Sequence, residues 1–189
     1  MNIGIDVDAV LLDWEKGLLA MAEIFDIEEC RGSGKVNDTY FIQDQYDWTT
    51  DEKEKFKNKY FLRLSEESNI MPGAIEVIHR LQKMGHKVII ISTRGTETEE
   101  MINIVANKFK ENNLTFDKYF WKEHNKLKVC KEENIDIMID DSPSTCTKMQ
   151  ENKIRTIYFR GLRGKKLNED EYLKEVNNWG QIYRILKEV

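Results

Sequence analysis

The sequence predicts an α/β fold in which a doubly wound parallel sheet carries a small helical insertion after the first strand. Two observations predict the sheet. Short apolar runs alternate with amphipathic stretches along the chain. These runs are apolar on both faces, as expected for strands that are covered by helices on each side. A third observation predicts the helical insertion, because residues 14–70 show helical spacing and turns but no alternating strand signal.

The elements follow in chain order. Residues 3–7 form the expected first strand, and apolar residues at helical spacing predict a helix from residue 11 to residue 25. The core domain is expected to comprise residues 1–13 and 71–189, and the cap residues 14–70. Pro72 suits the first turn of the next helix, which should end near Gly85. The later strands are expected at 88–91, 119–121, 135–139 and 154–159, and the later helices at 97–112, 126–133, 144–151 and 178–186.

Composition narrows the class of protein. The chain has 189 residues and a net charge of −5, so it has no basic excess with which to bind a nucleic acid polymer or a membrane surface. No apolar stretch reaches the roughly 20 residues of a membrane span, and no signal peptide pattern is expected at the N-terminus. Cys30, Cys130 and Cys146 show no CxxC spacing, which indicates reduced thiols and a cytoplasmic protein.

Three of the predicted strands end in groups that can carry chemistry. Because the carboxyl ends of parallel strands meet where the strand order reverses, these groups should share one site. Four carboxylates at one edge would repel one another unless a divalent cation lies among them, and hard oxygen ligands suit Mg²⁺. Since Mg²⁺ favours few carboxylates plus a substrate phosphate, a phosphorylated ligand is expected. The groups are Asp6 and Asp8, then Ser92 and Thr93, then Asp140 and Asp141.

Such a set can transfer a phosphoryl group. One aspartate can attack phosphorus and form an aspartyl phosphate. A second carboxylate can protonate the leaving oxygen and later activate water. A hydroxyl and a lysine ammonium can hold the equatorial oxygens, where charge accumulates. The alternative is that these aspartates only cap helices.

These residues resemble the motifs of the haloacid dehalogenase-like phosphohydrolases. The similar segments are Asp6-Val-Asp8-Ala-Val10, the strand-end Ser92, Lys126 and the Asp140-Asp141 pair. The insertion after the first motif also resembles the small helical cap of that superfamily. Residues 71–74 (Met-Pro-Gly-Ala), 90–94 (Ile-Ile-Ser-Thr-Arg) and 139–143 (Ile-Asp-Asp-Ser-Pro) resemble its 5′-nucleotidase branch, which includes the 5′(3′)-deoxyribonucleotidases.

The resemblance implies a role for each residue. Asp6 would be the nucleophile, and Asp8 the general acid and base. Asp6, Asp8, Asp140 and Asp141 would serve Mg²⁺, with Asp8 acting through its backbone carbonyl. Ser92 would bind the phosphoryl oxygens, and Thr93, one residue later in the chain, is the alternative for that role. Lys126 would stabilise the phosphoryl group. The chain departs from the family at Ala9, where glycine is common.

The cap offers candidate substrate contacts. Its aromatic residues could stack on a base or could form the small core of the cap, and Arg94 could reach the site or form a structural ion pair. These cap candidates are Tyr40, Phe41, Tyr46 and Trp48.

The favoured hypothesis is a Mg²⁺-dependent phosphatase that acts on nucleoside monophosphates, as a monomer or a homodimer. One alternative is a phosphatase for sugar phosphates or another small phosphomonoester. The other, of a different class, is a non-catalytic Mg²⁺- or nucleotide-binding module, or a receiver-type domain phosphorylated on aspartate. A receiver would need neither the long helical insertion nor the second carboxylate, Asp8.

Overall fold

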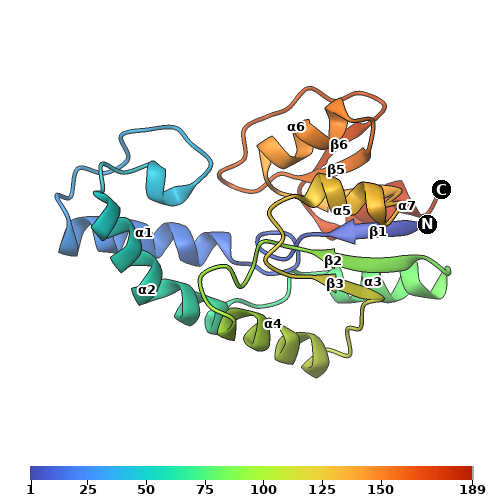
Figure 1. The fold of residues 1–189 in the computed structure, drawn as a ribbon, viewed down its shortest axis with the longest axis horizontal. Helices are drawn as coiled ribbons and strands as arrows, with labels where there is room; N and C mark the ends of the chain where they lie inside the picture. Colours follow the sequence, from blue (N-terminus) through green and yellow to red (C-terminus); the bar gives the residue numbers. More distant parts are fainter. Residues whose placement is uncertain (189) are drawn as a thin grey trace.

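The sheet has six parallel strands in the order β3-β2-β1-β4-β5-β6. The computed structural model describes residues 1–188. As Figure 1 shows, the sheet and its helices form one part of the molecule, and α1 and α2 extend from it. The strands are β1 (Asn2–Ile5), β2 (Lys87–Ile91), β3 (Lys118–Phe120), β4 (Ile137–Asp140), β5 (Arg155–Phe159) and β6 (Leu173–Val176). The helices are α1 (Glu15–Glu29), η1 (Ile42–Asp44), α2 (Thr50–Glu67), α3 (Ala74–Lys83), α4 (Glu100–Glu111), α5 (Lys126–Glu132), α6 (Pro143–Glu151) and α7 (Trp179–Leu186).

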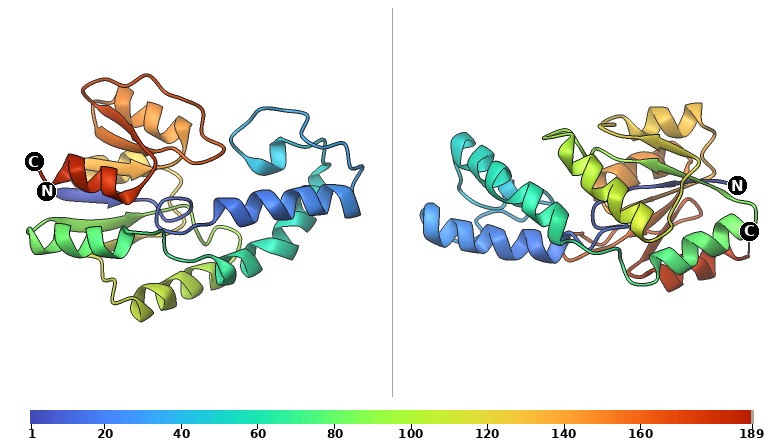
Figure 2. Two further views of the ribbon diagram at one scale, coloured as in Figure 1. Left: turned by 180° about the vertical axis from the view of Figure 1, so that it is seen from behind. Right: turned by 90° about the horizontal axis from the view of Figure 1, so that it is seen from below.

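Helices cover both faces of the sheet, which explains why its strands are apolar throughout. Ile3, Ile5 and Ile90 belong to the core cluster that includes α3 and α7. The alternate residues Ile89 and Ile91 belong to a second cluster with α5 and α6. The right-hand view of Figure 2 shows α5 on one side of the sheet and α3 and α7 on the other. The doubly wound sheet predicted from the sequence is confirmed.

The strand order reverses between β1 and β4. Ile5 of β1 pairs with Ile90 of β2 on one side and with Ile139 of β4 on the other. From β1 the chain proceeds outward to β2 and β3, and then returns across β1 to form β4, β5 and β6. The connections therefore diverge beyond the carboxyl ends of β1 and β4, and a crevice is expected there.

The segment between β1 and α3 holds α1, η1 and α2 and contributes no strand to the described sheet. Its two connections to the core run side by side. The Asp13 amide donates to the Asn69 carbonyl at 2.9 Å, and the Met71 amide donates to the Leu11 carbonyl at 2.7 Å. We call residues 14–70 the cap, keeping the predicted boundaries.

Two expectations about elements were wrong. The first helix begins at Glu15 rather than at residue 11, because the chain turns tightly after β1. The amides of Leu11 and Leu12 both donate to the Val7 carbonyl at 2.9 Å, and Ala9 has a φ of +58°. Strand β6 was not predicted, because its sequence, Leu-Lys-Glu-Val, lacks the apolar run of a buried strand and lies at the edge of the sheet.

Trp179 anchors the last helix, as expected. Its side chain is buried, and its indole Nε1 donates to the Val10 carbonyl at 2.9 Å. It thus ties α7 to the loop that follows β1. Within residues 1–188, no helix combines the length and the apolar character needed to cross a membrane.

Candidate active site

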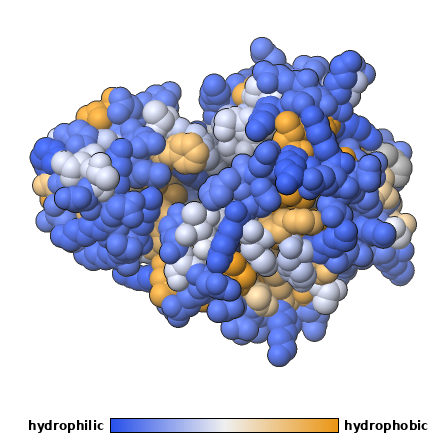
Figure 3. Space-filling view, viewed as in Figure 1, coloured by the Kyte–Doolittle hydropathy of each residue, from blue (hydrophilic) through white to orange (hydrophobic). Residues whose placement is uncertain are grey.

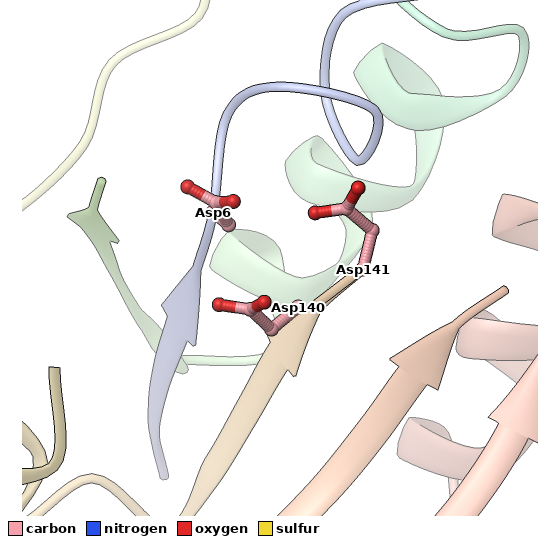
Figure 4. Close-up of side chains that lie close together, drawn as sticks. All are labelled: Asp6, Asp140 and Asp141. Carbon is pink, nitrogen blue, oxygen red and sulfur yellow. The ribbon is translucent and has the colours of Figure 1, made fainter. Parts of the chain in front are cut away.

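Three carboxylates meet at the crevice between β1 and β4. Asp6 follows β1, Asp140 ends β4 and Asp141 comes directly after it. All three side chains are buried, and one oxygen from each lies within 4.8 Å of the others. Figure 4 shows the three carboxylates around a common space beyond the ends of the two strands. The structure thus brings together three of the four aspartates predicted to serve a metal.

Lys126 supplies a positive charge to this cluster. It is the first residue of α5, whose N-cap is Asn125. Its Nζ lies 2.6 Å from Asp140 Oδ2 and 3.1 Å from Asp6 Oδ1. Burial alone would lower the pKa of Lys126, but the charges of Asp140 and Asp6 outweigh it and raise that pKa. Lys126 therefore stays protonated, as the predicted role in balancing phosphoryl charge requires.

The carboxylates outnumber the nearby positive charges. Burial raises the pKa of Asp140 and of Asp141, and for Asp141 the charges of Asp6 and Asp140 add to the increase. Asp6 Oδ1 is buried and lies 3.1 Å from the Lys126 ammonium. In an octahedral Mg²⁺ site, opposite oxygen ligands lie roughly 4 Å apart. The spacing of the three carboxylates and their oxygen donors therefore fit a hard divalent cation.

Asp8 lies beside this cluster rather than within it. Its side chain is partly exposed and lines the cavity described below, while Oδ1 accepts from the Arg94 guanidinium. Burial raises the pKa of Asp8, and the neighbouring Arg94 opposes that increase. Arg94 itself is buried and bonded to Asp8, and it also lines the cavity, so it forms the expected ion pair and lies at the site as well.

The two hydroxyls after β2 are placed differently. Ser92 is fully buried, its Oγ accepts from the Arg94 amide at 3.3 Å, and it does not line the cavity. Thr93 is exposed and does line it. Of the two hydroxyl residues between which the sequence left the phosphoryl-binding role open, Thr93 lines the cavity and Ser92 is buried.

A cavity of about 440 Å³ lies over the carboxylates, between the core and the cap. In Figure 3 the surface is notched where the two parts of the molecule meet. The core contributes Asp6, Asp8, Thr93, Arg94, Thr96, Glu97, Met101, His124, Lys126, Asp141, Ser142, Ser144, Thr145 and Arg163 to the lining. The cap contributes Trp14, Leu18, Tyr40, Phe41, Ile42, Gln43, Lys57 and Phe61.

Only two of the four predicted cap aromatics reach the cavity, namely Tyr40 and Phe41. Tyr46 and Trp48 are buried in the cap, where their rings stack with centroids 4.5 Å apart. Trp48 also packs edge-on against Phe25 of α1. Of the two alternatives that the sequence left open for the cap aromatics, Tyr46 and Trp48 therefore follow the second and form the small core of the cap, and they do not serve as the substrate contacts for which they were candidates.

Arg163 is a cavity residue that the sequence did not reveal. It lies between β5 and β6, and its guanidinium stacks on the Tyr40 ring at 4.5 Å. Its Nε donates to Glu15 at 2.9 Å and its Nη1 to the Tyr40 carbonyl at 3.0 Å. The Tyr40 hydroxyl in turn donates to Asp141. No motif marked Arg163, because only the path of the loop after β5 brings it to the site.

Comparison with known proteins identifies the fold. No family model and no curated protein matches the sequence. Among solved structures, a predicted phosphatase from Clostridium acetobutylicum matches with a TM-score of 0.67 and 15% identity, over 100% of this chain and 98% of that one. A haloacid dehalogenase-like hydrolase from Streptococcus pneumoniae matches with a TM-score of 0.65 and 13% identity, over 97% of each chain.

A predicted phosphoglycolate phosphatase from Haemophilus somnus matches with a TM-score of 0.62 and 13% identity, over 97% of this chain and 96% of that one. At such low identity, the likeness concerns the arrangement of the chain rather than its chemistry. The protein has the fold of the haloacid dehalogenase-like hydrolases.

Proposed function

We propose that this protein is a Mg²⁺-dependent phosphomonoester hydrolase that works through an aspartyl phosphate. The observation that carries the proposal is the buried cluster of Asp6, Asp140 and Asp141 with Lys126, beneath a cavity that the cap borders. Phosphoryl transfer needs a nucleophile, positive charge and exclusion of bulk water, and this arrangement supplies all three. A simple binding module would need no second carboxylate beside the cluster.

The residues divide the reaction between them. An Asp6 oxygen forms a bond to phosphorus while the ester P–O bond breaks, and the leaving oxygen takes a proton from Asp8. Water then attacks the aspartyl phosphate, gives its proton to Asp8 and releases inorganic phosphate. Lys126 balances charge on the phosphoryl oxygens, and the Thr93 hydroxyl donates to one of them.

Asp6, Asp140 and Asp141 would hold Mg²⁺, directly or through water, together with the Asp8 carbonyl that the resemblance implies. The bound ion would offset negative charge between these carboxylates and the substrate phosphate.

Nucleoside monophosphates are the proposed substrates. Trp14, Phe41 and Phe61 line the cavity on the cap side, and stacking of a base on an aromatic ring stabilises a complex by roughly 1 to 3 kcal/mol. The cavity volume of about 440 Å³ also lies within the usual range for small-molecule sites, roughly 300 to 1,000 Å³.

A sugar phosphate is the second candidate substrate, because polar side chains also line the cavity. Gln43 and Lys57 from the cap and His124 from the core could bind hydroxyls. One solved structure with the same fold, a mutant of CbbY from Rhodobacter sphaeroides, is a complex with xylulose-1,5-bisphosphate. It matches with a TM-score of 0.59 and 12% identity, over 92% of each chain.

Hydrolysis rates for a panel of nucleoside and sugar monophosphates, with and without Mg²⁺, test the proposal. We expect turnover only with the metal, and higher kcat/KM for nucleotides.

Asp6→Asn should lower kcat on the order of 10³-fold or more, because it removes the attacking carboxylate. Asp13→Asn, at a partly exposed aspartate outside the cavity, is the matched control and should keep full activity. Full activity in Asp6→Asn would exclude Asp6 as the nucleophile, and a preference for sugar phosphates would favour the second candidate.

A further inference from the structure

Arg94 is a buried cation next to the proposed site, and the mechanism above gives it no role. Its side chain has no exposed surface. It follows β2, two residues after Ser92. A buried guanidinium is strongly destabilising unless charged and polar partners surround it. The identity of those partners therefore indicates what the residue does.

The first partner is Asp8. Arg94 Nε donates to Asp8 Oδ1 at 3.1 Å, and Nη2 donates to the same oxygen. Among the described residues, no hydrogen bond reaches Asp8 Oδ2, and the Asp8 side chain is 27% exposed at the cavity wall. Arg94 thus fixes one carboxylate oxygen and leaves the other free to exchange a proton with a bound molecule.

The other partners belong to the cap and to α4. Arg94 Nη1 donates to Ser65 Oγ of α2 at 2.9 Å and to the Met101 carbonyl at 3.3 Å. The guanidinium also lies over the Trp14 ring, with its carbon 5.1 Å from the ring centroid. Trp14 begins the cap and Ser65 lies near its end, so a single guanidinium touches both ends of the cap segment.

We propose that Arg94 is a positioning residue that holds the Asp8 carboxylate in its reactive orientation only while the cap is docked on the core. The inference rests on the proposed function, in which Asp8 moves the proton. If the cap swings away, Ser65 and Trp14 leave the guanidinium, which then loses two of its supports. Lysine could not replace arginine, because a single ammonium cannot reach Asp8, Ser65 and Met101 with a fixed planar fork.

Two serines of the same helix end give a matched test. Ser65 and Ser68 are both buried, and each hydroxyl donates to the carbonyl four residues earlier. Of these two serines, only Ser65 also contacts Arg94.

Kinetics with two substrates use this difference. For an alkyl phosphomonoester, the leaving oxygen needs a proton, and Ser65→Ala should lower kcat/KM about 10-fold. This loss is part of the roughly 10²- to 10⁴-fold acceleration that a general acid supplies. For p-nitrophenyl phosphate, whose leaving group needs little proton transfer, the loss should be smaller. Ser68→Ala should leave both substrates unaffected.

A double-mutant cycle identifies the residue through which Arg94 acts. Arg94→Lys should lower kcat/KM for the alkyl ester about 10- to 100-fold in the wild-type background. In an Asp8→Asn background the same substitution should have no further effect, because the residue it positions is already disabled. Losses that multiply across the two backgrounds would overturn the proposal, as would equal rates for Ser65→Ala and Ser68→Ala.

Hydrogen exchange tests the link to the cap without any substrate. The Asp13 and Met71 amides bond across the two connections between core and cap. In Ser65→Ala these amides should exchange faster than in Ser68→Ala, and equal exchange would exclude the link. If the wild-type protein hydrolyses no phosphomonoester, the proposed function fails, while this measurement still decides whether Arg94 holds the cap.

Discussion

At the scale of single residues, Ala9 shows how the loop after β1 is built. It follows Asp8 and has a φ of +58°, in the left-handed region where a side chain is disfavoured by roughly 1 to 2 kcal/mol. Its methyl group is buried, which offsets part of that strain. Alanine can therefore occupy this position, where the family that the sequence resembles commonly has glycine. Its side chain is small enough to fit the tight turn that the fold imposes.

Two substitutions at position 9 should separate backbone strain from packing. Ala9→Gly should change the free energy of unfolding by less than about 1 kcal/mol, because relief of strain is offset by the lost methyl group and by the more flexible unfolded chain. Ala9→Val should destabilise by more than about 2 kcal/mol, because a β-branched residue suits neither this φ nor a filled site. Urea denaturation of both variants measures this; equal stability would show that the turn is not constrained.

At the scale of elements, the loop between β5 and β6 is held to the cap by Glu15. This buried residue begins α1, and its carboxylate accepts from the Leu162 amide at 2.6 Å and the Arg163 amide at 2.8 Å. It also pairs with the Arg163 side chain, which stacks on Tyr40. A single carboxylate thus orders one wall of the cavity.

Removing that charge should loosen the wall. Glu15→Gln is expected to destabilise the protein by about 2 to 4 kcal/mol, because it leaves Arg163 buried without its main counter-charge. Glu28→Gln, at an exposed position of the same helix, is the control and should stay within about 0.5 kcal/mol of wild type. Chemical denaturation gives both values. Equal stability of the two variants would mean that Glu15 contributes nothing beyond a surface charge.

At the scale of the whole molecule, the sheet and the cap together leave little of a charged cluster exposed to water. Burial raises the pKa of Asp140 and Asp141, so between about pH 4 and those raised values the folded chain binds more protons than the unfolded chain. Without metal, the stability contributed by these groups is therefore present at low pH and is lost as the pH rises through the folded-state pKa.

Binding of Mg²⁺ should reverse this dependence of folding stability on pH. The ion binds deprotonated carboxylates, so the rise in Tm on adding Mg²⁺ should be larger at about pH 8 than at about pH 5. At a concentration of 100 times Kd the stabilisation would be about 2.7 kcal/mol. Thermal unfolding at both pH values checks this, with Asp141→Asn as the variant expected to lose most of the gain. A gain independent of pH would contradict binding by the carboxylate cluster.

The sequence alone determined the class of fold and the position of the cluster. Apolar runs separated by helical stretches predict a parallel sheet, because strands buried on both faces must be apolar throughout. Reactive residues at strand ends predict a shared site, because parallel strands bring those ends to one edge. Asp6, Asp140 and Asp141 could be found in this way, whereas Lys126 came from the resemblance to a known family.

Only the tertiary structure decided which side chains face the cavity. Ser92 and Thr93 differ by one residue of register, and the path of the chain after β2 buries the first and exposes the second. Tyr46 and Trp48 belong to the cap interior, while Arg163 reaches the site from a loop without any pattern. The physical reason is that periodicity records contacts between neighbours in the chain, whereas the direction of a loop side chain depends on residues far away in sequence.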